Sequence, residues 1–210
     1  MTDLRIRAAT PEDLDAVLAF WKVAAEGTSI SDDRDGVERL VARDPEALIL
    51  AEQGGELVGT VIAGFDGWRC HLYRLAVLPG RRRQGIGSAL LAAAEGTSIS
   101  DDRAGVERLV ERDPEALVLA EQDGELVGTV IAGFDGWRCH LYRLAVHPGR
   151  RRQGIGSALL AAAEERLVRL GGRRGDAMVL VRNERAHHAW RAAGYAPEEH
   201  WRRWVKPLTG

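Results

Sequence analysis

Cysteine, lysine and long apolar segments are scarce in this chain of 210 residues. Cys70 and Cys139 are its only cysteines, too few for a disulfide framework, so we expect a reducing, cytoplasmic setting. Only two of the 29 basic residues are lysines, Lys22 and Lys206. No apolar run approaches the roughly 18 residues of a membrane span, and the first residues lack a signal-peptide pattern. The formal net charge of −2 lacks the basic excess of nucleic-acid binders. We therefore expect neither membrane nor nucleic-acid partners.

A long internal repeat dominates the sequence. Residues 24–95 and 93–164 align at a constant offset of 69, and five of the 72 aligned positions differ. The differing pairs are Asp35/Ala104, Ala42/Glu111, Ile49/Val118, Gly54/Asp123 and Leu78/His147. Removing one copy leaves 141 residues, a normal size for one domain. The chain therefore looks like a single-domain parent with a duplicated segment, whether recent or deliberate in origin.

Hydrophobic periodicity and turn residues predict the order of elements in the parent. We expect strands over 4–9, 47–52, 56–65, 71–77 and 178–181, with a last one near 201–205. We expect helices over 14–25, 32–43 and 88–94, a longer helix ending at 170, and a helix over 184–193. This order predicts an α+β fold with a mixed, mostly antiparallel sheet flanked by helices and extended by the duplicated α-β-β-β-α segment.

A glycine-containing loop joins a strand to a helix in each copy. In copy 2 it follows the strand ending at Val146 and contains Arg151-Arg152-Gln153-Gly154-Ile155-Gly156. The first N–H groups of a helix lack intrahelical partners, and together with the helix dipole they form an anion site suited to a pyrophosphate. The glycines let the backbone approach phosphate closely, and the arginines add charge-assisted hydrogen bonds.

Two segments at this point resemble the GCN5-related N-acetyltransferase (GNAT) family. "LAVHPGRRRQGIGSALL" (144–160) is similar to its acetyl-CoA motif, and "VRNERAHHAWRAAGY" (181–195) is similar to its second motif. The resemblance covers the whole 141-residue parent. It implies an acetyl-CoA-dependent N-acetyltransferase that transfers acetyl directly to a primary amine of a small molecule or peptide.

The resemblance also implies which residues bind acetyl-CoA, and it implies no metal. The pantetheine arm would lie along the strand before the loop, and the pyrophosphate would take the loop N–H groups. The cofactor-binding residues implied in copy 2 are Leu144, Ala145, Val146, Arg151, Arg152, Gln153, Gly154, Ile155, Gly156, Ser157 and Asn183. Those implied in copy 1 are Val77, Arg82, Arg83, Gln84, Gly85 and Gly87.

The acid and base residues depart from the family pattern. Many relatives carry a tyrosine seven residues after the motif asparagine, whereas this chain has Trp190, whose indole N–H is not a useful acid. Either the thiolate leaves with help from water or His187, one helical turn earlier, replaces the tyrosine, and a surface position on an amphipathic helix is the simpler explanation of His187. His140 and Tyr142 share one face of their strand and are candidate catalytic residues, with sheet packing as the alternative.

The duplication leaves the arrangement and the function open. We expect residues 1–95 to form an incomplete unit and residues 96–210 a nearly complete one, joined in one elongated sheet. The alternatives are a parent-like fold of residues 1–23 with copy 2, and a homodimer that exchanges halves. The competing functional hypothesis is an engineered or relic scaffold that binds acetyl-CoA at most, without turnover.

Overall fold

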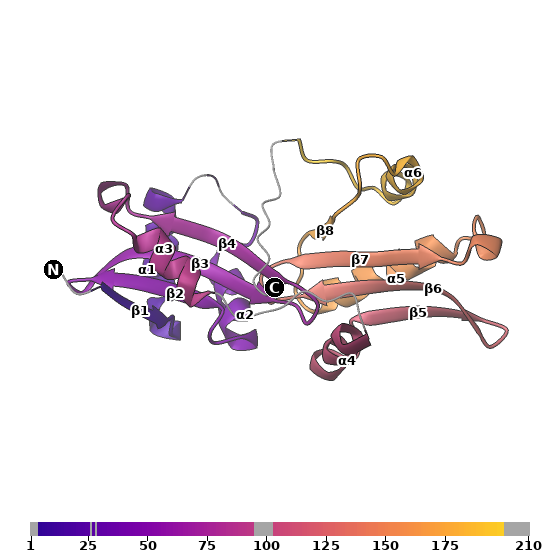
Figure 1. Cartoon of the computed structure of the whole chain (residues 1–210), viewed down its shortest axis with the longest axis horizontal. Helices are drawn as coiled ribbons and strands as arrows, with labels where there is room; N and C mark the ends of the chain where they lie inside the picture. Colours follow the sequence, from indigo (N-terminus) through magenta and orange to yellow (C-terminus); the bar gives the residue numbers. More distant parts are fainter. Residues whose placement is uncertain (1–3, 26, 28, 95–102, 200–210) are drawn as a thin grey trace.

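The chain folds into two four-stranded sheets, each flanked by helices, which lie one after the other along the long axis of the molecule (Figure 1). The structure is a computed structural model and describes residues 4–25, 27, 29–94 and 103–199. The strand expected near 201–205 lies outside these residues. The boundary expected at 95/96 also lies outside them, so the division into 1–95 and 96–210 stays a prediction.

The N-terminal unit contains the first strand and the first helix. Its elements are β1 (Leu4–Ala8), α1 (Leu14–Ala24), α2 (Arg34–Arg43), β2 (Leu48–Gln53), β3 (Glu56–Phe65), β4 (Cys70–Val77) and α3 (Ile86–Ala93). The strands pair antiparallel in the order β1-β2-β3-β4. Helix α1 places Leu14, Val17 and Trp21 in the core of this unit, as their helical spacing predicts.

Among the described residues, the C-terminal unit has no counterpart of β1 and α1, but it contains the later elements. They are α4 (Arg103–Arg112), β5 (Leu117–Gln122), β6 (Glu125–Phe134), β7 (Cys139–Val146), α5 (Ile155–Arg169), β8 (Gly175–Ala177) and α6 (Glu184–Ala192). The sheet order is β5-β6-β7-β8, and β8 pairs with β7 in parallel. Strand β8 is shorter and earlier than the predicted strand over 178–181, where Met178, Leu180 and Val181 are exposed instead.

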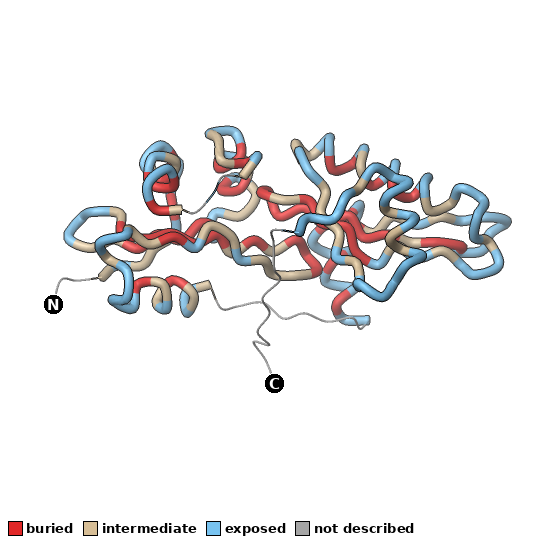
Figure 2. Tube along the Cα trace, turned by 90° about the horizontal axis from the view of Figure 1, so that it is seen from above, coloured by how far each residue is buried: buried red, intermediate tan, exposed pale blue. Residues whose placement is uncertain are grey.

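The expected single elongated sheet is wrong, because the described strands form two separate sheets and none pairs across from one sheet to the other. The parent-like alternative is not observed either, because β1 pairs with β2 of copy 1. The units instead meet through the turns of their β3–β4 and β6–β7 hairpins. Figure 2 shows buried residues running through both units, with more exposed chain in the C-terminal one.

Tyr142 of β7 is at the centre of the contact between the units. Its hydroxyl donates to Asp66 Oδ2 at 2.7 Å and lies 2.6 Å from His71 Nε2. Asp66 also accepts from the backbone N–H of Trp68 and Arg69 in its own turn. The N-terminal hairpin turn thus forms a polar socket for a tyrosine of the other unit.

The same contact is repeated with the roles of the units exchanged. Tyr73 Oη donates to Asp135 Oδ2 at 3.1 Å and lies 2.5 Å from His140 Nε2. The His71 and His140 rings stack between the two tyrosines, with centroids 3.8 Å apart. Each of these residues lies 69 positions from its counterpart, so the interface is isologous and the units are related by a pseudo-twofold axis.

Ion pairs extend the pseudo-symmetric contact at its edge. Arg43 Nη2 lies 3.1 Å from Asp113 Oδ2, and its mate Arg112 Nη2 lies 3.3 Å from Asp44 Oδ2. The two arginines also lie over phenylalanine rings of the opposite unit. The duplicated segment therefore supplies both sides of one interface.

Candidate functional site

Strand β7 continues beyond its pairing with β8. The two strands pair only where Cys139–Leu141 lies beside Gly175–Ala177. Beyond that point, Arg143 adopts a left-handed conformation with φ 51°, next to a register shift against β6. A bulge of this kind bends the strand and ends regular pairing. Among the described residues, no strand pairs with the outer edge of Leu144–Val146. This edge can accept an extended ligand.

The loop after β7 ends at the exposed N-terminus of α5. Arg152 and Gly154 have positive φ, 62° and 81°, and Gly154 is the N-cap of α5 without a side-chain cap bond. The first N–H groups of α5 are thus available to an external acceptor. Residues Leu159, Leu160 and Ala163 bury the opposite face of α5 in the core of the unit. The helix is firmly placed, and its N-terminus faces outward beside the end of β7.

The space at this N-terminus fits a phosphate group. A Cβ atom on Gly156 would meet only Val146 Cγ2, at 3.7 Å, so packing does not require glycine there. Arg151 Nε donates to Val146 O at 3.1 Å, which places its exposed guanidinium beside the loop. Arg152, Gln153 and Ser157 are exposed as well. Backbone N–H groups, arginines and an open glycine position form a suitable donor set for a pyrophosphate.

Copy 1 has the same loop without the second strand. Gly85 has φ 82°, and Arg82 Nε donates to Val77 O at 3.2 Å, as in copy 2. Strand β4, however, is an edge strand, and no described strand occupies the place that β8 has beside β7. The cofactor-binding residues expected in copy 1 therefore form one wall of a cleft, and their role stays a prediction.

The side chains of His140 and Tyr142 lie in the interface between the units, although His140 is also opposite Asp176 in the pairing of β7 with β8. Both are 8% exposed. Burial, with His71 next in effect, lowers the pKa of His140 to about 3, and burial raises the pKa of Tyr142 far above its usual range. A base that cannot be protonated near neutral pH and an acid that cannot ionise are poorly suited to proton transfer. Their catalytic roles remain predictions that this geometry does not support.

Asn183 and His187 lie at the start of α6. Asn183 Oδ1 accepts from Ala186 N at 3.2 Å and caps the helix. His187 Nε2 lies 3.1 Å from both Leu180 O and Val181 O, so this nitrogen carries the proton and donates to them. Trp190 packs edge-on against Tyr195, with ring centroids 4.9 Å apart. It is partly buried, packs against the core of the unit and does not replace the tyrosine of the family pattern.

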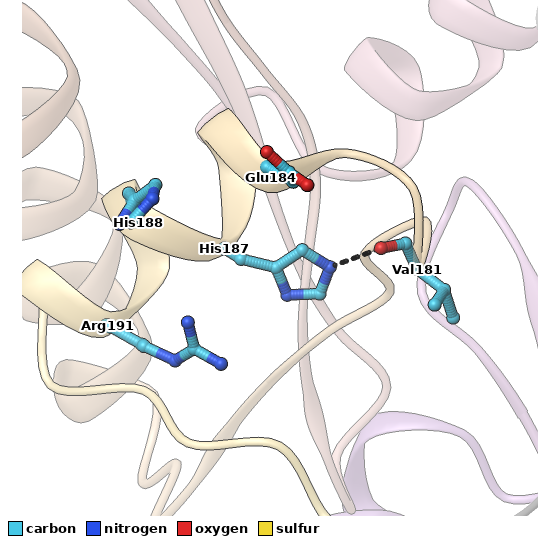
Figure 3. Close-up of a pocket in the computed structure, with 5 residues that line it drawn as sticks. All are labelled: Val181, Glu184, His187, His188 and Arg191. Carbon is cyan, nitrogen blue, oxygen red and sulfur yellow. Dashed lines mark hydrogen bonds between the residues drawn. The ribbon is translucent and has the colours of Figure 1, made fainter.

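An open hollow of about 390 Å³ borders α6 (Figure 3). It is lined by Val181, Glu184, His187, His188 and Arg191. His187 lies beside this hollow with its Nε2 turned toward the carbonyl of Val181. The structure thus brings His187 together with acidic and basic neighbours, and separates it from His140 and Tyr142.

Sequence reasoning missed the interface network and the buried Arg166. Arg166 donates to Ala132 O at 2.7 Å and pairs with Asp113, joining α5 to the sheet and to the end of α4. A buried arginine on an otherwise amphipathic helix is not visible in the pattern. The interface could have been suspected, because identical repeats offer identical surfaces that can pair with each other.

Two further classes of site are not seen among the residues that the structure describes. Their His, Cys, Asp and Glu side chains form no cluster of three or more suited to a metal ion. Within the same residues, no helix has the length and apolarity to cross a bilayer.

Comparison with known proteins places these observations in a family. A sequence profile of the acetyltransferase (GNAT) family matches residues 14–110 and 95–195. An acetyltransferase of Pectobacterium atrosepticum is 31% identical over 115 residues, covering 55% of this chain and 82% of the relative. One from Photorhabdus laumondii is 42% identical over 71 residues, covering 34% of this chain and half of the relative.

A solved structure supports the fold. The GCN5-related N-acetyltransferase of Sphaerobacter thermophilus superposes with a TM-score of 0.52 at 17% identity, covering 91% of each chain. The profile matches each copy of the repeat, and both copies fold into a helix-flanked, largely antiparallel sheet. The chain is therefore a tandemly duplicated member of the acetyltransferase (GNAT) family.

Proposed function

We propose that the chain is an acetyl-CoA-dependent N-acetyltransferase whose working site lies in the C-terminal unit. The observation that carries this proposal is the edge of β7 beyond β8, which no described strand pairs with and which ends beside the uncapped N-terminus of α5. Among the described residues, only this unit has a further strand, β8, paired with the strand that precedes the glycine loop. The relatives are acetyltransferases, which favours acetyl transfer over a scaffold without turnover.

The residues of this unit divide the binding of acetyl-CoA between them. The N–H groups of Arg152–Gly156 would bind the pyrophosphate, with Arg151 and Arg152 adding charge. The outer edge of Leu144–Val146 would pair with the pantetheine arm, and Asn183 would border it from α6. Acetyl-CoA supplies an activated thioester, and the backbone N–H groups of this edge are suited to stabilise the oxyanion.

Proton transfer requires further groups, because a primary alkylamine has a pKa near ~10.4 and must lose a proton before it attacks. His187 is our proposed participant. Its Nε2 is bound to two carbonyl groups, so Nδ1 of the neutral ring is the acceptor, and the protonated ring can donate from Nδ1 to a leaving thiolate. Glu184 and Arg191 border the same hollow and can set its charge.

The proposal also covers the acceptor, the compartment and the partners of the chain. The acceptor is a primary amine of a small molecule or peptide, the compartment is cytoplasmic, and neither nucleic acid nor membrane is a partner. A homodimer that exchanges halves stays a prediction.

The proposal is tested by amine-dependent formation of CoA from acetyl-CoA. The purified chain would be incubated with alkylamines, amino sugars and peptides that have a free N-terminus, and CoA would be measured by chromatography. We expect CoA formation with at least one amine class, its loss in Gly156→Trp and its retention in Gly87→Trp. Acetyl-CoA binding without turnover on any amine would contradict the proposed activity and favour the scaffold.

A further inference from the structure

Matched residues in the two units differ sharply in exposure. Leu50 of β2 is 1% exposed, whereas its copy Leu119 of β5 is 48% exposed. Val37 of α2 is fully buried, whereas its copy Val106 of α4 is 36% exposed. The sequences are nearly identical, so the difference comes from what covers each unit. In the N-terminal unit that cover is β1 and α1.

The exposed apolar surface of the C-terminal unit adjoins the outer edge of β5, with which no described strand pairs. We call it the vacant face and define it by Val106, Val110, Leu119 and Leu126 together with the outer edge of β5. In the N-terminal unit the matching edge of β2 is filled by β1, from Leu4 opposite Gln53 to Ala8 opposite Ile49. An apolar face beside an unpaired edge strand favours association with another polypeptide.

The polar groups around the vacant face identify the kind of segment that it fits. In the N-terminal unit Arg7 of β1 donates to Glu52 at 3.0 Å, and Asp15 of α1 lies 2.7 Å from Arg34. In the C-terminal unit the copy of Glu52 is Glu121, which is exposed, and the copy of Arg34 is Arg103, whose side chain is 92% exposed. The charges are therefore complementary to a basic strand followed by a helix with an acidic first turn.

The partners of Trp21 in the N-terminal unit have counterparts beside the vacant face, at the interface between the units. Trp21 of α1 donates from Nε1 to Thr60 and packs edge-on against Trp137 of the other unit, with centroids 5.6 Å apart. The pseudo-twofold mate of Trp137 is the buried Trp68, and the copy of Thr60 is Thr129. A helix with the chemistry of α1, seated on the C-terminal unit, would find the same two partners there.

We propose that the vacant face is a docking site for the β1–α1 segment, residues 4–24, of a second copy of this chain. The segment would extend the sheet along β5 and cover the four apolar residues. A second copy can donate the segment, because the contacts that the segment would lose in its own N-terminal unit match those it would gain on the C-terminal unit of the other chain. Each chain has one such segment and two faces that accept it, so a chain that donates its segment leaves the matching face of its own N-terminal unit open.

The first experiment uses a synthetic peptide of residues 4–24 with a photoreactive group at Leu18, together with the full-length chain. We expect saturation at one peptide per chain and cross-links within residues 103–146. Mass spectrometry can assign the copy, because Val118 and Asp123 distinguish it from Ile49 and Gly54. Absence of saturable binding, or cross-links confined to copy 1, would overturn the proposal.

Two matched substitutions sharpen this test. Leu119→Arg changes a half-exposed residue of the vacant face, and we expect it to weaken peptide binding at least ten-fold. Val168→Arg changes a residue of α5 that is 69% exposed and outside the face, and binding should be unchanged. Equal binding to wild type and Leu119→Arg would refute the assignment.

A second experiment tests the donor. The full-length chain with the photoreactive group at residue 18 should give intermolecular products joined to copy 2, in a yield that rises with protein concentration. If irradiation gives only intramolecular products at all concentrations, a second copy is not the occupant. Neither experiment depends on acetyl transfer, so their outcome is independent of the proposed activity.

Discussion

His140 links protonation to the stability of the contact between the units. Its ring stacks on His71, and its Nε2 lies 2.5 Å from Tyr73 Oη. Burial lowers the pKa of His140 from 6.5 to about 3 in the folded chain. Between these two values the unfolded chain binds a proton that the folded chain does not. The free energy of unfolding must therefore decrease as the pH falls through this range.

The size of this effect follows from the shift. Each pKa unit corresponds to about 1.4 kcal/mol, so proton binding to the unfolded chain lowers the free energy of unfolding by about 4–5 kcal/mol by pH 3. About 2 kcal/mol of that loss should already appear between pH 6.5 and pH 5. Domains are stable by about 5–15 kcal/mol in total, so the loss is measurable.

Urea unfolding of the wild type and of His140→Gln, from pH 7.5 to pH 4.5, measures this contribution. The glutamine amide can still donate to Tyr73 but does not titrate. We expect the variant to be less stable at pH 7.5, because it loses the ring stack, and to lose about 1 kcal/mol less per pH unit below pH 6. Parallel curves for the two proteins would refute the conclusion that His140 is buried in its neutral form.

Two further predictions concern the same interface, and a third concerns the core of the C-terminal unit. Tyr142→Phe should destabilise the chain by about 1–3 kcal/mol in urea unfolding, because buried Asp66 loses its hydroxyl donor; an unchanged midpoint would contradict this. Gly133→Ala should cost about 1–3 kcal/mol, since the added Cβ would lie 2.7 Å from Asp66 Oδ2; a neutral effect in thermal unfolding would mean that the turns are not in close contact. Cys139 should react with a thiol reagent far more slowly than half-exposed Cys70, because burial raises its pKa to about 12; equal rates of labelling would argue against its burial.

The order of elements and the position of the glycine loop before α5 could be predicted from the sequence, because both depend on local patterns. Alternation and turn residues placed β3 at 56–65, and the glycines marked the start of α5. The family resemblance was confirmed by the profile matches. The strand predicted over 178–181 was wrong because a short apolar run does not show whether a partner strand reaches it.

The arrangement of the two copies could not be predicted, because it depends on contacts between distant segments. His140 and Tyr142 alternate with their neighbours as strand residues do, and that pattern does not distinguish a catalytic face from an interface. Their environment comes from His71 and Asp66, about 70 residues earlier in the chain. The expectation of one sheet failed for the same reason, since the hairpin turns form the contact and the strand edges do not.

Calorimetric titration of the full-length chain with acetyl-CoA tests the central claim most directly. We predict one site per chain, lost in Gly156→Trp and retained in Gly87→Trp, because among the described residues only the C-terminal unit has a further strand paired with the strand before its loop. The two substitutions are matched, since a Cβ at either glycine would meet only the last valine of the preceding strand. The distance is 3.7 Å from Gly156 to Val146 and 3.9 Å from Gly87 to Val77. No heat of binding in the wild type, or a site that survives Gly156→Trp, would contradict the account.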